Sequence, residues 1–173
     1  KGSLQTTTTG SLNTATGYSA LYSNTTGTSN SAFGRNTLAL NTTGAENTAV
    51  GGQALKCTTT GGQNTAVGYA ALYTNTTGCY NVAIGCGALF ANTTGTWNTG
   101  LGYQALHYNT TGTSNTAVGR NAMNSGTTSS YNTVIGYRGL YNITTGLRNT
   151  GSGYKALHSL TTAADNTASG FKA

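Results

Sequence analysis

Few residues of this 173-residue chain are of the types that perform acid–base, nucleophilic or metal chemistry. The carboxylates are Glu46 and Asp165, and the imidazoles are His107 and His158. Two carboxylates at a suitable separation can act as general acid and base, and His, Cys and carboxylate groups together can hold a metal ion. Such chemistry requires the fold to bring these side chains together.

A repeat of 17 residues runs through the chain without an insertion or a deletion. Asn recurs at this interval from Asn13 to Asn166, and we number each repeat from this Asn as position 1. Position 5 is Gly in all ten repeats, positions 13 and 14 are Thr-Thr, and position 9 is Leu except at Met123. The consensus is N-T-A-V-G-Y-x-A-L-x-x-N-T-T-G-x-x. We call the residues at one position in successive repeats a column.

The strict period predicts a solenoid. In a solenoid every coil contacts its neighbours through the same columns, so one extra residue would break the register of all of them. Thr, Asn and Gly are poor helix formers, which disfavours a helical repeat. We therefore predict an all-β solenoid or β-roll of ten 17-residue coils with parallel stacked strands. Residues 1–173 form a single uncapped array, expected to be a segment of a longer fibre.

Within a coil the pattern has a period of two. The segment 81–85, Asn-Val-Ala-Ile-Gly, predicts a short strand, with the aliphatic column at position 4 as the core. Gly at position 5 either ends the strand or lets the backbone turn with positive φ. A second short strand is predicted around positions 8 and 9, returning a buried Leu. The N-T-T-G run is predicted to close the coil through left-handed Asn and Gly. Two aliphatic side chains per coil make a small core, which favours a trimer or a laterally packed filament.

Stacking separates the chemically competent residues. Coils about 4.8 Å apart would place Glu46 and Asp165, seven coils apart at position 17, more than about 30 Å from each other. His107 and His158 lie three coils apart in a column that is otherwise largely aromatic. The three cysteines fall in different columns and fit neither a disulfide framework nor a zinc site. We expect no enzyme activity, no catalytic residues, no cofactor and no metal.

Charge and hydropathy exclude two further classes of partner. Charged residues make up 6% of the chain, and the net charge of +6 comes from basic residues of which no two are adjacent. A nucleic-acid groove needs clustered cations, so we expect no nucleic acid. No run of 18 apolar residues is present, so we expect no membrane insertion.

Two other residue sets are candidates for surface functions. Tyrosines at positions 6 and 10 would form an outward ridge that contacts glycans or neighbouring fibres, or would instead cover a turn or fill a groove between chains. The pairs are Tyr18 with Tyr22, Tyr69 with Tyr73, and Tyr137 with Tyr141. Six N-x-T sequons make the protein a glycoprotein candidate, although a turn-forming role for these Asn residues is the alternative. They begin at Asn24, Asn41, Asn75, Asn92, Asn109 and Asn142.

The segments 81–85 and 64–68 resemble the N-S-V-A-I-G head repeats of YadA-type trimeric autotransporter adhesins. The full unit resembles repeats of phage tail fibres and bacterial surface fibres. The resemblance implies a fibre-forming β-roll in which three chains share a core. We expect a structural, extracellular fibre or filament shaft on a cell or virion surface, with itself as partner in a homotrimer or filament. The alternatives are an adhesin that binds cell-surface glycans through Tyr and Lys/Arg columns and, more remotely, an ice-binding solenoid.

Overall fold

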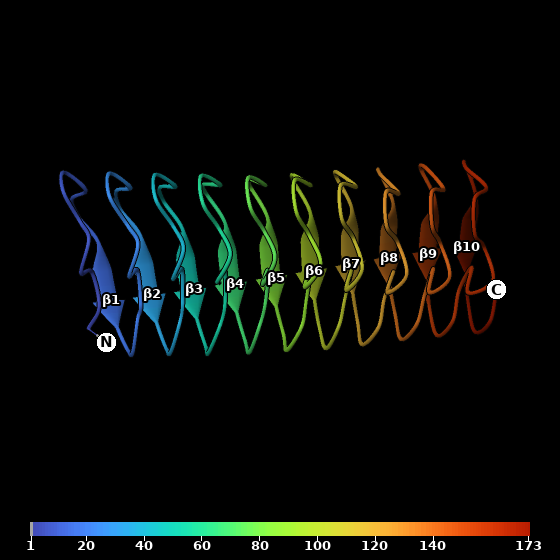
Figure 1. Ribbon diagram of the computed structural model, residues 1–173. Helices are drawn as coiled ribbons and strands as arrows, with labels where there is room; N and C mark the ends of the chain where they lie inside the picture. The colour runs from blue at the N-terminus through green and yellow to red at the C-terminus, as the bar shows by residue number, and fades with distance from the viewer. Residues whose placement is uncertain (1) are drawn as a thin grey trace.

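The computed structural model describes residues 2–173 as a rod of stacked coils, with the two ends of the chain at opposite ends of the rod (Figure 1). Each coil contributes one three-residue strand at positions 2–4, and the described residues include no helix. The strands are β1 (Thr14–Thr16), β2 (Ser31–Phe33), β3 (Thr48–Val50), β4 (Thr65–Val67), β5 (Val82–Ile84), β6 (Thr99–Leu101), β7 (Thr116–Val118), β8 (Thr133–Ile135), β9 (Thr150–Ser152) and β10 (Thr167–Ser169). The predicted all-β solenoid of parallel strands is confirmed.

The ten strands form one parallel sheet in sequence order. Paired residues are one repeat apart throughout, as in Ala66 with Ala83. The backbone ladder continues on both sides of each strand: the Val82 N–H donates to the Asn98 carbonyl at 2.8 Å, and the Gly85 N–H donates to the Val67 carbonyl at 2.8 Å. Because every coil repeats these bonds, an inserted residue would interrupt the ladder, which explains the strict period.

The turns differ from the sequence expectation. Gly at position 5 has φ between +111° and +144°, one of the two predicted alternatives, but the other left-handed residues lie at positions 7, 9 and 17. Leu72 at position 9 has φ +51°, so positions 8 and 9 form a turn and not a second strand. The Asn and Gly of the N-T-T-G run are not left-handed. A bulky Leu with positive φ is unfavourable by itself. Full burial of Leu72 and its N–H bond to the Ala88 carbonyl at 3.0 Å offset that strain.

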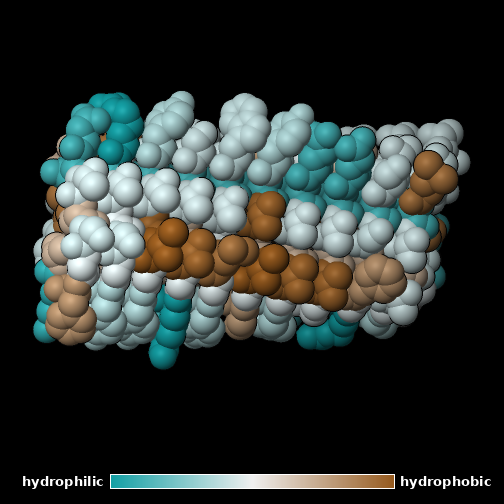
Figure 2. Space-filling model, turned by 180° about the vertical axis from the view of Figure 1, so that it is seen from behind, coloured by the Kyte–Doolittle hydropathy of each residue, from teal (hydrophilic) through white to brown (hydrophobic). Residues whose placement is uncertain are grey.

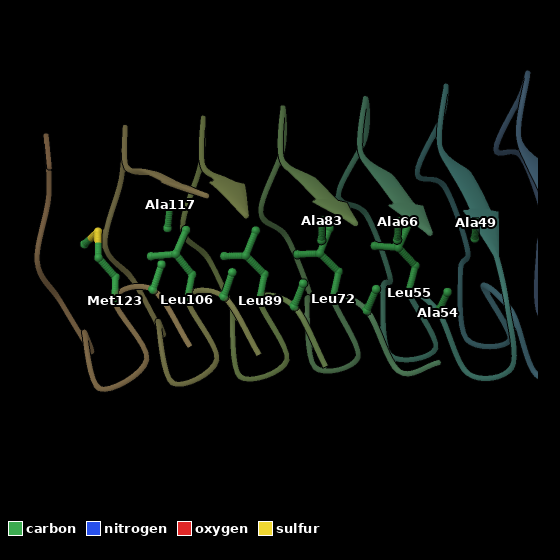
Figure 3. Packing of buried hydrophobic residues seen from close by; sticks show 14 of the residues in the cluster. Ala49, Ala54, Leu55, Ala66, Leu72, Ala83, Leu89, Leu106, Ala117 and Met123 are labelled. Carbon is green, nitrogen blue, oxygen red and sulfur yellow. The ribbon is translucent and has the colours of Figure 1, made fainter. Parts of the chain in front are cut away.

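The core lies on the inner side of the strands and is narrow (Figure 3). The Leu column at position 9 is fully buried from Leu21 to Leu140, with Met123 in place, and it packs on buried small residues at positions 3 and 8 such as Ala83 and Ala88. The predicted core column at position 4 is wrong: Ile84 is 43% exposed. Strand side chains alternate between faces. Position 3 faces inward, where Ala or Gly fits beside Leu and where Val134 is buried against Gly139, and positions 2 and 4 face outward.

Two asparagine columns hydrogen-bond along the rod axis. At position 1, the Asn81 Nδ2 donates to the Asn64 Oδ1 at 3.1 Å and to the Gly95 carbonyl at 2.9 Å. The Asn81 Oδ1 accepts from the backbone N–H of Asn98 at 3.0 Å. This chain of carboxamides runs unbroken from Asn13 to Asn166. Each Asn therefore ties its coil to the coils on both sides.

We expect Leu72→Ala to lower the free energy of unfolding by about 3 kcal/mol, because a fully buried side chain is removed and a cavity is left. Val67→Ala, at position 4 on the outer face of the same coil, should cost less than about 1 kcal/mol, since Val67 is only half-buried. Urea denaturation of both variants measures the difference. A larger loss of unfolding free energy for Val67→Ala than for Leu72→Ala would show that position 4, and not position 9, forms the core.

Candidate functional site

The outer face of the sheet carries an apolar band along the rod (Figure 2). It is formed by the position-4 column, which is apolar in seven successive coils. Its members are Phe33, Val50, Val67, Ile84, Leu101, Val118 and Ile135, of which Phe33, Val50, Ile84 and Ile135 are exposed and the others half-buried. Position 2 beside it is mostly Thr. We call these two columns the strand face.

Aromatic side chains stack between successive coils. At position 10, Phe90 lies between Tyr73 and His107 with both ring centroids 5.1 Å away. At position 6, Tyr154 lies between Tyr137 at 5.2 Å and Phe171 at 5.0 Å. These stacks follow from the coil spacing of about 4.8 Å, which is close to the separation of stacked rings. Each ring in the middle of a stack has both faces covered.

The six predicted tyrosines lie in these outer columns, but they do not share one environment. Tyr18 and Tyr69 are exposed, and Tyr22, Tyr73, Tyr137 and Tyr141 are half-buried. The Tyr69 hydroxyl accepts from the Gln53 Nε2 at 3.1 Å, and the Tyr73 hydroxyl accepts from the Lys56 Nζ at 3.0 Å. The link between positions 6 and 10 is Arg138, whose guanidinium lies 5.5 Å from the Tyr137 ring and 5.1 Å from the Tyr141 ring.

The sequon asparagines at position 12 are internal. Asn24, Asn41, Asn75, Asn92 and Asn109 are fully buried. Each donates its Nδ2 to the position-15 carbonyl of its own coil, and three of them also donate to the Asn of the preceding coil. A glycan attached to any of these five nitrogens would have to replace those bonds inside the coil. Asn142, at position 11, is half-buried.

The Thr-Thr pairs lie at a bend of the coil, where successive backbone N–H groups such as those of Thr76 and Thr77 donate to one carbonyl, that of Thr93. The position-13 hydroxyls donate to the position-13 carbonyl of the next coil, as in Thr76 to Thr93 at 3.0 Å. The position-14 threonines are all exposed. From Thr25-Thr26 to Thr144-Thr145 the first threonine of each pair is half-buried and the second is exposed, whereas both are exposed in the pairs Thr8-Thr9 and Thr161-Thr162. A separate outward column at position 2 is also mostly Thr.

The residues capable of acid–base chemistry are dispersed. Asp165 accepts from Arg148 at 2.6 and 2.8 Å, and this hydrogen-bonded pair lowers the pKa of the exposed Asp165 carboxyl. Glu46 accepts from the Gln63 amide at 2.9 Å. Burial raises the pKa of Cys57, which keeps its thiol protonated. Within residues 2–173, no group of three or more His, Cys, Asp or Glu could hold a metal ion.

The basic residues are dispersed along the sequence, with no two adjacent, whereas the fold aligns half of them. Arg120 at position 6 and Arg138, Lys155 and Lys172 at position 7 occupy four successive coils. We call these four side chains the basic row. The signal was present in the sequence, because the last three are 17 residues apart. A search for adjacent charges misses cations that become neighbours only through the period.

Comparison of the chain with protein-family models, curated proteins and solved structures finds no match. No helix in the described part of the chain is long and apolar enough to cross a membrane.

Proposed function

We propose that this protein is a structural rod, a shaft segment of an extracellular fibre, in which copies associate side by side along the strand face. The observation that supports this proposal most is the unbroken Asn13–Asn166 ladder, which ties all ten coils into one body. A rod held by bonds along its own axis resists bending and stretching between coils. Such a segment holds the parts attached to its ends at a fixed separation of about 50 Å, from ten coils at about 4.8 Å.

The strand face supports side-by-side association. A continuous apolar column flanked by uncharged Thr releases water favourably when it is covered, and no charged group has to be desolvated. No charged residue occupies positions 2 or 4 in any coil, so two such faces meet without electrostatic repulsion. Cyclic or isologous contacts between identical chains would place the same column from each copy around one axis. The matching coil spacing would also keep the copies in register.

The test of this proposal is the mass of the particle in solution and its shape. Sedimentation and electron microscopy of the wild-type chain should show trimers or longer threads. The triple variant Val67→Thr, Ile84→Thr, Leu101→Thr should shift these particles toward monomers, because the buried apolar area falls. Thr is native at position 4 in Thr16, so these substitutions keep the coil.

A matched control changes three exposed threonines of the position-14 column: Thr60→Ala, Thr77→Ala and Thr94→Ala. Its assembly state should equal that of the wild type. A wild-type chain that stays monomeric at all accessible concentrations, or a strand-face variant that assembles like the control, would contradict side-by-side association along this face.

A further inference from the structure

Each cation of the basic row lies against an aromatic ring. The Arg120 guanidinium lies between the rings of Tyr103, at 5.7 Å, and Tyr137, at 5.9 Å. Arg138 lies over Tyr137 and Tyr141, as described above. The Lys155 Nζ is 5.5 Å from the Tyr154 ring, and the Lys172 Nζ is 5.4 Å from the Phe171 ring. Contact with a ring restricts a long cationic side chain, so the row is partly ordered before any ligand arrives.

Within residues 2–173, no carboxylate side chain pairs with the basic row. Of the two carboxylates, Glu46 accepts from Gln63 and Asp165 pairs with Arg148, in the position-17 column. His158 lies near the row, and its pKa is lowered by burial and then by the charges of Lys155 and Arg138. Four cations therefore follow one another at about the coil spacing, about 5 Å, with their charge left for an external anion.

The rings beside the row distinguish between two classes of polyanion. Single-stranded nucleic acids bind aromatic side chains by stacking bases on free ring faces. Here Tyr154 has a ring on each side, and Tyr137 has Tyr154 on one face and Arg120 on the other. With these faces covered, the hydroxyls at the edges of Tyr137 and Tyr154 remain to hydrogen-bond sugar hydroxyls. The cations remain for charged groups, and Arg binds sulfate or carboxylate through two parallel N–H donors.

We propose that the basic row is a binding site for a linear acidic polysaccharide, lying along the rod over the coils of β7 to β10 (Figure 1). The polymer runs parallel to the rod axis, and its sulfate or carboxylate groups meet successive cations. This activity is separate from the shaft function, because the row lies at positions 6 and 7 and the strand face at positions 2 and 4. A rod with such a row adheres to an acidic polysaccharide surface along its side.

The test uses dextran sulfate as the probe, uncharged dextran of the same length as a ligand control, and an oligothymidylate of matched charge as the competing class. Wild-type protein should bind dextran sulfate, with a dissociation constant that rises steeply with salt, and should not bind dextran. The variant Arg138→Gln, Lys155→Gln should bind about ten-fold more weakly and with a shallower salt dependence. Gln is native at position 7 in Gln53 and Gln104, so the coil tolerates it.

A second variant, Arg35→Gln, Lys56→Gln, removes the same net charge outside the row. It should retain dextran sulfate affinity to within about two-fold, since most of the counterion release comes from the intact row. Circular dichroism spectra that match the wild type show that both variants are folded. Equal losses for the two variants would mean that net charge alone drives binding and would overturn the proposal. Absence of dextran sulfate binding would also overturn the proposal. So would binding of the oligothymidylate that is as tight as binding of dextran sulfate.

Discussion

Gly85→Ala is expected to cost more than about 4 kcal/mol of stability and to stop coils from stacking at that point, because one substitution violates both backbone and packing requirements. Gly85 has φ +133°, a conformation that an L-residue with a side chain rarely adopts. An added Cβ would lie 2.5 Å from the Gly102 carbonyl oxygen and 2.7 Å from its carbon. Those atoms belong to the next coil's backbone, and moving them would break the ladder on both sides.

Gly52→Ala is the matched control. Gly52 lies at position 6, and its φ is not in the left-handed region. Its added Cβ would meet the Tyr69 ring at 3.6 Å and the Arg35 carbonyl oxygen at 4.0 Å, both ordinary contacts. This variant should keep wild-type stability to within about 0.5 kcal/mol. Urea denaturation followed by circular dichroism compares the two. A Gly85→Ala protein as stable as Gly52→Ala would show that coils do not approach this closely.

Asn81→Ala should lower stability by about 4 kcal/mol, from one unpaired buried donor at about 2 kcal/mol and two further lost hydrogen bonds at about 1 kcal/mol each. The Asn98 backbone N–H loses the Asn81 Oδ1, its partner at 3.0 Å, inside the rod where water does not replace the bond. The Gly95 carbonyl loses the Asn81 Nδ2 but still accepts from the Asn92 Nδ2, and the Asn98 Nδ2 loses the Asn81 Oδ1 but still donates to the Gly112 carbonyl. Hydrogen exchange should rise first at Asn98 and in the coils on either side.

Asn142→Ala makes the same chemical change without the same loss. Asn142 is half-buried and makes no side-chain hydrogen bond with the described residues, so its replacement should change stability by less than about 1 kcal/mol. Comparable losses for the two variants would show that the carboxamide ladder contributes little beyond side-chain volume.

The features of the fold that depend on the 17-residue period could be predicted from the sequence. The parallel register and the buried Leu column follow from columns that must superpose. Which face of each strand points inward could not be predicted, because alternation alone does not say which set of residues faces the core. Hydrophobicity favoured Val and Ile at position 4, yet the width left beside Leu72 selects Ala at position 3.

The turns and the sequons were misjudged for a related reason. Local preference assigns left-handed backbone to Asn and Gly, but tertiary hydrogen bonds place it at Leu72 and at position 17. The sequon at Asn92 predicts an exposed Asn, whereas the Asn92 Nδ2 is buried and donates to the Asn75 Oδ1 of the preceding coil at 2.8 Å. Burial of this kind depends on neighbouring coils and is invisible in the local sequence. The basic row was missed because its members become neighbours only after stacking.

Distances between spin labels placed along one exposed column test the stacking of the coils most directly. In a chain whose three cysteines are replaced by Ser, pairs combine Thr26→Cys with Thr94→Cys, Thr128→Cys or Thr162→Cys, all at exposed position 14. Stacked coils predict separations of about 19, 29 and 38 Å, which grow in proportion to the number of coils between the labels. Separations that fail to increase in equal steps along the chain would contradict the in-register rod.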